Sequence, residues 1–251
     1  MHSVHPTPKF SIITVTYNAE KVLEDTIQSV ISQTYHHIEY IIVDGASKDG
    51  TLSIINRYRS RIHTVVSEPD KGLYDAMNKG IALASGDYLC FLNAGDCFHE
   101  DDTLQQMVHT INGNELPDIL YGETAIVDKD RHFLRMRRLS APETLTWKSF
   151  KQGMLVCHQA FFPRHTLVEP YNLLFCRFRL VHPHHEESTY FAQYPPDNHR
   201  LSGGGNDYPE SESIPQRKIS DHGKALRADW NRGASCMVRD PCSYSPVGEG
   251  I

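Results

Sequence analysis

The chain lacks the paired cysteine spacing of a zinc or redox site. Its six cysteines, at positions 90, 97, 157, 176, 236 and 242, are scattered through 251 residues. Cys90 falls within an apolar strand pattern, which favours a buried thiol that takes no part in chemistry. We therefore expect reduced thiols in a protein of the cytoplasm.

Long apolar runs and excess positive charge are also missing. No run approaches the roughly 20 apolar residues that span a bilayer, and residues 1–9 lack the apolar middle of a signal peptide. Any membrane contact is therefore expected to be peripheral, at the inner face. The net charge of −6 provides no global basic field for a polyanion. The local arginine cluster is typical of a solvated edge strand and comprises Arg131, Arg135, Arg137 and Arg138.

The first predicted strand is not followed by a G-x-G-x-x-G loop. Residues 10–16 lead instead into Tyr17 and Asn18. This disfavours a Rossmann dehydrogenase, because the glycines of that loop allow the backbone to approach a dinucleotide. A sugar nucleotidyltransferase is disfavoured as well, since it would require a Gly-rich loop with a basic residue at the same place.

Apolar strands alternate with amphipathic helices through the first 111 residues. The β-branched run at 10–16 predicts a buried strand, and apolar residues then recur at helical spacing up to Gln33. The same alternation predicts strands at 40–43, 63–66 and 88–92, and helices at 51–58, 74–84 and 102–111. It is typical of an α/β protein with a mainly parallel, doubly wound sheet. Residues 119–127 and 132–137 predict a hairpin beyond that sheet.

Polar residues stand where these strands end or the next helices begin. Asp44 follows one strand directly, and Asp96 follows another after Ala94 and Gly95. Ligands of open α/β sheets bind at the carboxyl edge, so Asp44 could accept a hydrogen bond from a base or ribose, and Asp96 could hold a hard cation with a diphosphate. Shaping a turn or capping a helix is the alternative for each carboxylate.

Two further segments carry candidate residues. Lys71 and Gly72 precede a helix that bears Asp75, Asn78 and Lys79, so amides and side-chain donors could meet an anionic or hydroxyl-rich ligand. An ordinary first helical turn is the alternative. His158 and Gln159 separate two apolar stretches, and His158 is either a structural group or a catalytic one.

Four segments, in order, resemble the bacterial family 2 glycosyltransferases: SIITVTYNAE, IIVDGASKDGT, EPDKGLYDAMNKGIALASGDYLCFLNAGD and CHQAFF. The likeness covers residues 9–172 and implies a GT-A fold, a Rossmann-like sheet flanked by helices. It also implies that Thr16, Tyr17 and Asn18 lie beside the nucleotide. Asp44 would contact the base, and the donor pocket would include Lys71, Gly72, Asp75, Asn78 and Asn93. Asp96 would match the last acidic residue of the metal-binding triplet, although Asn93 and Gly95 stand where relatives often have acidic residues.

The resemblance implies an inverting transfer of a sugar from a nucleotide-diphospho-sugar to an acceptor hydroxyl, in cell-surface polysaccharide biosynthesis. Mn²⁺ or Mg²⁺ would neutralise the leaving diphosphate, and a carboxylate base would take the hydroxyl proton. The acceptor would be a glycan or lipid-linked sugar, with no role for nucleic acid. Relatives carry the base in an S-A-D-F-D-W motif shortly after the HQAFF-like strand. Residues 175–181 read FCRFRLV instead, so His158 is the candidate that remains.

A reading-frame change would account for the missing motif, and a genuinely divergent tail is the alternative. With one choice of codons, residues 175–188 read one base later give SADFDWCIRIMKK, and continuing the shift can yield a helix-forming sequence with regular apolar spacing. We therefore hypothesise a frameshift, in the gene or in its sequencing, just before Phe175.

The composition changes beyond residue 172. The last 79 residues hold 7 of the 14 prolines and 7 of the 16 glycines, and no apolar period persists there. We therefore predict a catalytic domain at 1–172 and an irregular tail of doubtful order at 173–251. The alternative function is a catalytically impaired nucleotide-sugar binding protein that lacks its general base.

Overall fold

The computed structural model describes most of the chain up to residue 172 and four short segments beyond it. The described ranges are 7–111, 115–128, 130–146, 149, 155–172, 177–180, 189–193, 225–227 and 235–239. The other residues of the predicted tail lie outside this part of the chain. The predicted domain boundary at residue 172 therefore stays a prediction.

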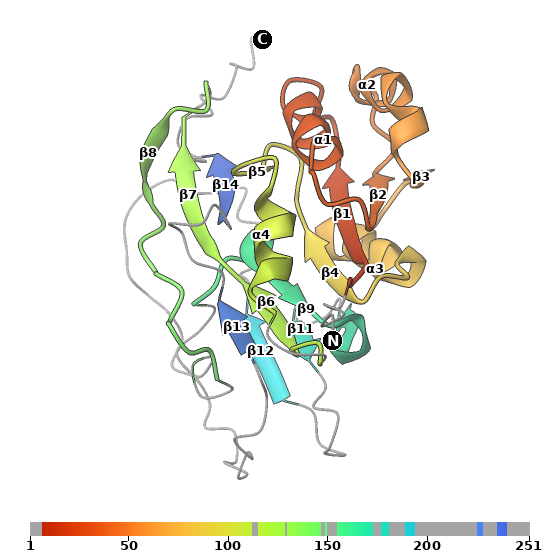
Figure 1. The fold of residues 1–251 in the computed structure, drawn as a ribbon. Helices are drawn as coiled ribbons and strands as arrows, with labels where there is room; N and C mark the ends of the chain where they lie inside the picture. The colour runs from red at the N-terminus through yellow and green to blue at the C-terminus, as the bar shows by residue number, and fades with distance from the viewer. Residues whose placement is uncertain are drawn as a thin grey trace, which may run out of the picture.

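A parallel sheet of four strands forms the first half of the molecule (Figure 1). Its spatial order is β3-β2-β1-β4, and every pair within it is parallel. The strands are β1 (Phe10–Thr16), β2 (Ile38–Asp44), β3 (Thr64–Ser67) and β4 (Tyr88–Phe91). All residues of β1 and β4 are buried, as expected for strands covered on both faces.

Helices cover both faces of this sheet because alternate strand residues point to opposite sides. On one face, Phe10 and Ile12 share an apolar cluster with residues of α1 (Leu23–Ile31), α2 (Thr51–Arg57) and α4 (Thr103–His109). On the other face, Ile13 and Val15 pack with Ala76, Met77 and Ile81 of α3 (Leu73–Leu83). The predicted doubly wound α/β arrangement is thus confirmed, with helix and strand ends within about two residues of expectation. A one-turn 3₁₀ helix, η1 (Arg59–Arg61), links α2 to β3.

The predicted hairpin exists, but its first strand is divided. Residues 119–127 form β6 (Ile119–Tyr121) and β7 (Glu123–Val127), which belong to different sheets, and β8 (Phe133–Met136) pairs antiparallel with β7. Gly122 separates the two, and its N–H donates to the carbonyl of Ala160 rather than to the ladder of β7. In Figure 1, β7 and β8 lie on the opposite side of the molecule from β3 and α2.

Short strands complete the other sheets. They are β5 (Cys97–Phe98), β9 (Phe161–Pro163), β10 (Val168–Asn172), β11 (Arg177–Leu180), β12 (Thr189–Gln193), β13 (Ala225–Arg227) and β14 (Ser235–Arg239), with the 3₁₀ helices η3 (His158–Ala160) and η4 (His165–Leu167). Of the last four strands, β11 pairs with β10 and β12, β13 with β6, and β14 with β5 and β7. In the part that the structure describes, Cys90, Cys97 and Cys157 are free thiols. No helix there has the length and apolarity to cross a membrane.

Glu39 joins three segments at the amino-terminal edge of the parallel sheet. Its carboxylate accepts hydrogen bonds from Lys9 Nζ (2.9 Å), Ser11 Oγ (2.6 Å) and both the backbone N–H and the hydroxyl of Ser85 (2.7 Å each). Burial alone would raise the pKa of Glu39, but the donors at Ser11, Ser85 and Lys9 outweigh it and lower the pKa to about 2. The ionised form is therefore the one that the fold stabilises.

Replacing this carboxylate should weaken the fold in a pH-dependent way. Because the folded-state pKa lies below the ordinary value of 4.5, the stabilisation is complete above that pH and is lost as pH falls toward about 2. We expect Glu39→Gln to lower the free energy of unfolding at pH 7 by about 1–3 kcal/mol. Urea titrations at pH 7 and pH 3 measure this. An equal loss at both pH values would contradict the assignment.

Candidate functional site

The carboxyl ends of β2, β1 and β4 lie next to one another in the sheet. Thr16, the last residue of β1, is paired with Asp44, the last residue of β2. Because β1 lies between β2 and β4, the ends of the outer two strands are about 10 Å apart. Asp44 and the turn that contains Asp96 are therefore at the same edge of the sheet, which is where open α/β sheets bind ligands.

The Asp44 carboxylate is fully buried and organises the turn after β2. It accepts hydrogen bonds from the backbone N–H and the hydroxyl of Ser47, the former at 3.0 Å, and from Ser67 Oγ at 2.6 Å. These donors satisfy a buried charge and tie β2 to the end of β3. Shaping the turn is thus an observed role of Asp44, while its contact with a base stays a prediction. No role is predicted from the sequence for Ser47, which lies in the turn itself, or for Ser67, which only tertiary contact brings to this carboxylate.

Asn18 connects the end of β1 to the same turn. Its backbone has a positive φ of 48°, and its N–H donates to Ser47 Oγ at 2.8 Å. Its side-chain oxygen accepts from the N–H of Lys48 at 2.9 Å. Asparagine tolerates this left-handed conformation better than most residues do, so the sequence favours the bend at this position.

Tyr17 and Asp70 flank Gly45 at the edge of the sheet. Tyr17 is 62% exposed. A Cβ placed on Gly45 would lie 3.2 Å from Tyr17 Cδ2 and 2.6 Å from Asp70 Oδ2, so glycine allows this approach. Three loops thereby present an aromatic ring, a backbone turn and a carboxylate together. No role is predicted from the sequence for Asp70, although its position directly before the candidate residues Lys71 and Gly72 could have indicated one.

The first turn of α3 is held by its own acidic residues. Gly72 has a φ of 109°, its N–H donates to Asp70 Oδ1 at 2.8 Å, and the N–H of Lys71 donates to Asp75 Oδ2 at 3.1 Å. Both polar atoms of the Asn78 amide bind the backbone of Tyr171, at 3.0 and 2.6 Å, which fastens β10 to α3. The donor-pocket roles of Lys71, Gly72, Asp75 and Asn78 stay predictions.

The turn after β4 is fixed by backbone contacts and by one amide side chain. Gly95 has a φ of 102°, and its N–H donates to Thr26 Oγ1 at 2.8 Å. The N–H of Asp96 donates to the carbonyl of Asn93 at 2.9 Å. Gln159 Nε2 donates to Asp96 Oδ2 at 2.8 Å, and both side chains are buried. The contact between Gln159 and Asp96 was not predicted, since 63 positions separate the two residues.

His158 lies beside the same turn as a neutral imidazole. Burial first and the nearby charge of Arg137 second lower the pKa of His158 to about 4. The Nδ2 atom of Asn93 lies 3.1 Å from His158 Nε2. The two side chains share a hydrogen bond whose direction depends on the ring tautomer. Consecutive residues of η3 thus contact both Asn93 and Asp96.

Two buried oxygen atoms at this edge have no hydrogen-bond donor in the described part of the chain. They are Thr16 Oγ1, at the end of β1, and Asn93 Oδ1, in the turn after β4. Buried polar atoms are normally paired, so these oxygens fit the donor groups or the cation of a ligand. A carboxylate at Asp96 and an amide oxygen at Asn93 are the hard donors that Mg²⁺ and Mn²⁺ prefer. The residues present therefore fit a divalent ion.

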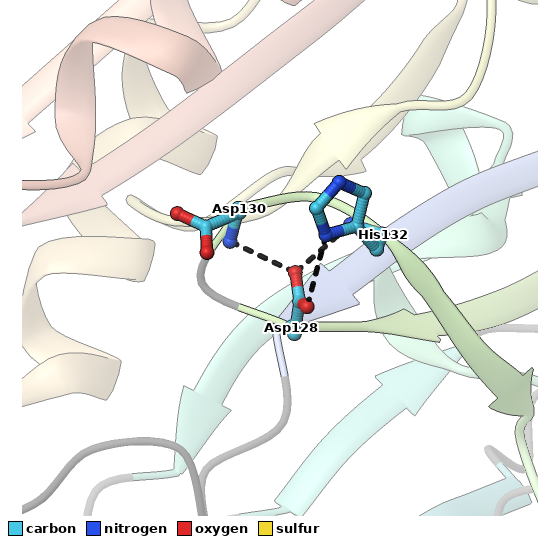
Figure 2. A group of neighbouring side chains, drawn as sticks. All are labelled: Asp128, Asp130 and His132. Carbon is cyan, nitrogen blue, oxygen red and sulfur yellow. Dashed lines mark hydrogen bonds and ion pairs between the residues drawn. The ribbon is translucent and has the colours of Figure 1, made fainter.

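Another cluster of potential metal ligands lies elsewhere, at the turn between β7 and β8. Asp128, Asp130 and His132 have ligand atoms within 4.8 Å of one another (Figure 2). Asp128 Oδ1 accepts from the N–H groups of Asp130 (2.8 Å) and His132 (2.9 Å), and Oδ2 lies 3.2 Å from His132 Nδ1. These bonds, first of all the one from the His132 backbone, lower the pKa of Asp128. They account for the cluster as a turn built around one aspartate.

Known proteins resemble this chain over part of its length. A PGL/p-HBAD biosynthesis glycosyltransferase of Mycobacterium bovis is 36% identical over 180 residues, which cover 69% of this chain and 66% of the relative. A putative teichuronic acid biosynthesis glycosyltransferase, TuaG of Bacillus subtilis, is 41% identical over 103 residues, 40% of this chain and 41% of that protein. The chain thus spans slightly less than two thirds of the length of the first relative.

The fold also has a solved counterpart. The crystal structure of S. aureus TarS residues 1–349 superposes with a TM-score of 0.50 at 21% identity, over 63% of this chain and 48% of that one. This likeness concerns the fold alone, which is the GT-A fold. The sequence model of Glycosyl transferase family 2 matches residues 11–169, which contain the parallel sheet, the turn of Asp96 and the η3 segment. The chain therefore belongs to glycosyl transferase family 2.

Proposed function

We propose that this chain transfers a sugar from a nucleotide-diphospho-sugar to an acceptor hydroxyl during cell-surface polysaccharide biosynthesis. The observation that carries the proposal is the placement of Asp44 and the turn of Asp96 at one sheet edge, two strands apart. A nucleoside diphosphate can bridge this span, with its base near the turn after β2 and its phosphates near the turn after β4. Membership in glycosyl transferase family 2 and the names of the relatives support the same activity.

The residues divide into three groups along the donor. Thr16, Tyr17 and Asn18 would line the nucleoside with Asp44, and Tyr17 is exposed enough to contact a base. Lys71, Gly72 and Asp75 would face the donor from the start of α3, whereas the Asn78 amide would support this segment through its two bonds to the backbone of Tyr171. Asn93 and Asp96 would hold the diphosphate end together with Mn²⁺ or Mg²⁺, and the bound ion would neutralise the charge that develops on the leaving group.

The acceptor side defines the main alternative. His158 is buried and neutral, and its Nε2 already shares a hydrogen bond with Asn93, so it is poorly placed to take a proton from an acceptor. An inverting transfer would need a carboxylate base, and the hypothesised frameshift would restore the motif expected to supply one after residue 174. The alternative is a protein that binds the donor but does not turn it over. In either case we propose a cytoplasmic location at the inner face of the membrane, and for the transferase a glycan or lipid-linked acceptor.

Calorimetry with uridine and guanosine diphosphate tests the donor site. We expect one of them to bind more tightly with Mn²⁺ than without, and Asp96→Asn to weaken the Mn²⁺-dependent part by about 10–100-fold, because an amide has no charge to offer the ion. Asp102→Asn at the start of α4 is the matched control. A nucleotide affinity that changes neither with Mn²⁺ nor with Asp96→Asn would contradict the metal role.

Restoring the reading frame tests the acceptor side. We expect a chain that continues with SADFDWCIRIMKK from position 175 to transfer sugar at least 100-fold faster than the present chain, because general base catalysis contributes about 10²–10⁴-fold. Both chains should bind the nucleotide alike. Resequencing is the direct check, and an intact series of codons through residues 170–190 would refute the frameshift.

The protonation state of His158 can be measured without any ligand. Its NMR ring signal should titrate with a midpoint near pH 4. The unfolded chain titrates near 6.5, so it binds more protons between these values, and the folded state should lose stability as pH falls from about 6.5 to 4. His158→Gln identifies the signal and should remove this part of the pH dependence. A midpoint near 6.5 would show that the ring is solvated.

A further inference from the structure

The η3 segment contacts the turn of Asp96 through the side chains of His158 and Gln159. Gln159 also forms a hydrogen bond with Cys157. Gln159 is 5% exposed, so water competes little with its hydrogen bonds. Its Nε2 atom donates to Asp96 Oδ2, and its Oε1 atom accepts a hydrogen bond from the thiol of Cys157. The amide therefore bridges a thiol and the carboxylate on which donor binding is proposed to depend.

The two ends of an amide are chemically different, so its orientation decides what Asp96 meets. Burial, the largest influence, raises the pKa of the Cys157 thiol, so the sulfur keeps its hydrogen at neutral pH and can donate it. The Asp96 carboxylate only accepts and so selects Nε2, while the thiol that donates to Oε1 at the other end favours the same orientation. The reversed amide would set Oε1 against the carboxylate, an approach of two acceptors in a buried place, and would leave Nε2 facing the thiol.

We propose that Gln159 is a positioning residue for Asp96 and that the Cys157 thiol fixes the orientation of the Gln159 amide. The inference rests on the proposed function, in which Asp96 holds a divalent ion. With Oδ2 held by Gln159, the carboxylate is oriented before a nucleotide arrives. Outer partners of this kind contribute about 10–100-fold to metal affinity.

The 251-residue chain and four variants test the positioning role by calorimetry, with Mn²⁺ and the nucleoside diphosphate that binds. Gln159→Leu should weaken Mn²⁺-dependent binding by about 10–100-fold. Cys157→Ala should weaken it by about 3–10-fold, the effect of one hydrogen bond, whereas Cys157→Ser keeps a donor and should stay within about 3-fold of the parent. Gln105→Leu, which removes an amide that contacts His109 on α4, should leave binding unchanged. Parental affinity in Gln159→Leu would overturn the proposal.

A second measurement needs no ligand and separates this proposal from the proposed function. In the ligand-free parent, the side-chain N–H₂ signals of Gln159 should be protected from hydrogen exchange. Cys157→Ala should remove that protection and Cys157→Ser should retain it, with the backbone signals of β1 and β4 unchanged. Protection that persists in Cys157→Ala would overturn the role of the thiol. If the parent binds no nucleoside diphosphate, the proposed function fails, and the exchange pattern alone supports or overturns the positioning of Asp96.

Discussion

The parallel pairing of β1 with β2 on one side and β4 on the other is the constraint on which the site depends. A parallel sheet places every carboxyl end at one edge, so the chain that leaves each strand must turn there. Tyr17, Gly45 and the turn of Asp96 become neighbours for this reason, although they are far apart in the sequence. The burial of β1 and β4 on both faces fixes this register, because a slip of one residue would exchange the side chains that meet α1 with those that meet α3.

The polar side chains at this edge serve the fold and the proposed ligand together. The Asp44 carboxylate holds the turn after β2, and Asn18 ties the end of β1 to the same turn. Such contacts fix the backbone in the ligand-free protein, so less conformational entropy is lost on binding. The capping and turn-forming alternatives for these residues therefore do not exclude a functional role. The same hydrogen bonds that shape the turns also pre-organise the edge for a ligand.

The η3 segment connects the parallel sheet to the sheet that contains β6 and β9, although the two are far apart in the sequence. His158 and Gln159 reach the turn of Asp96 from outside the parallel sheet, and the adjoining β9 pairs with β6. The geometry of the turn that contains Asp96 thus depends on residues that follow the sheet by more than 60 positions.

The doubly wound α/β order, helices α1 to α4 and the common edge of Asp44 and Asp96 could be predicted from the sequence, because alternating apolar periods and strand ends are local properties. The sequence also carried the likeness to family 2 glycosyltransferases. It did not show that residues 119–127 divide at Gly122, since that depends on a hydrogen bond to Ala160. Nor did it show that Ser67 meets Asp44 or that Gln159 holds Asp96. These contacts could not be predicted, because hydrogen bonds between distant segments depend on how sheets and loops pack and leave no local pattern in the sequence.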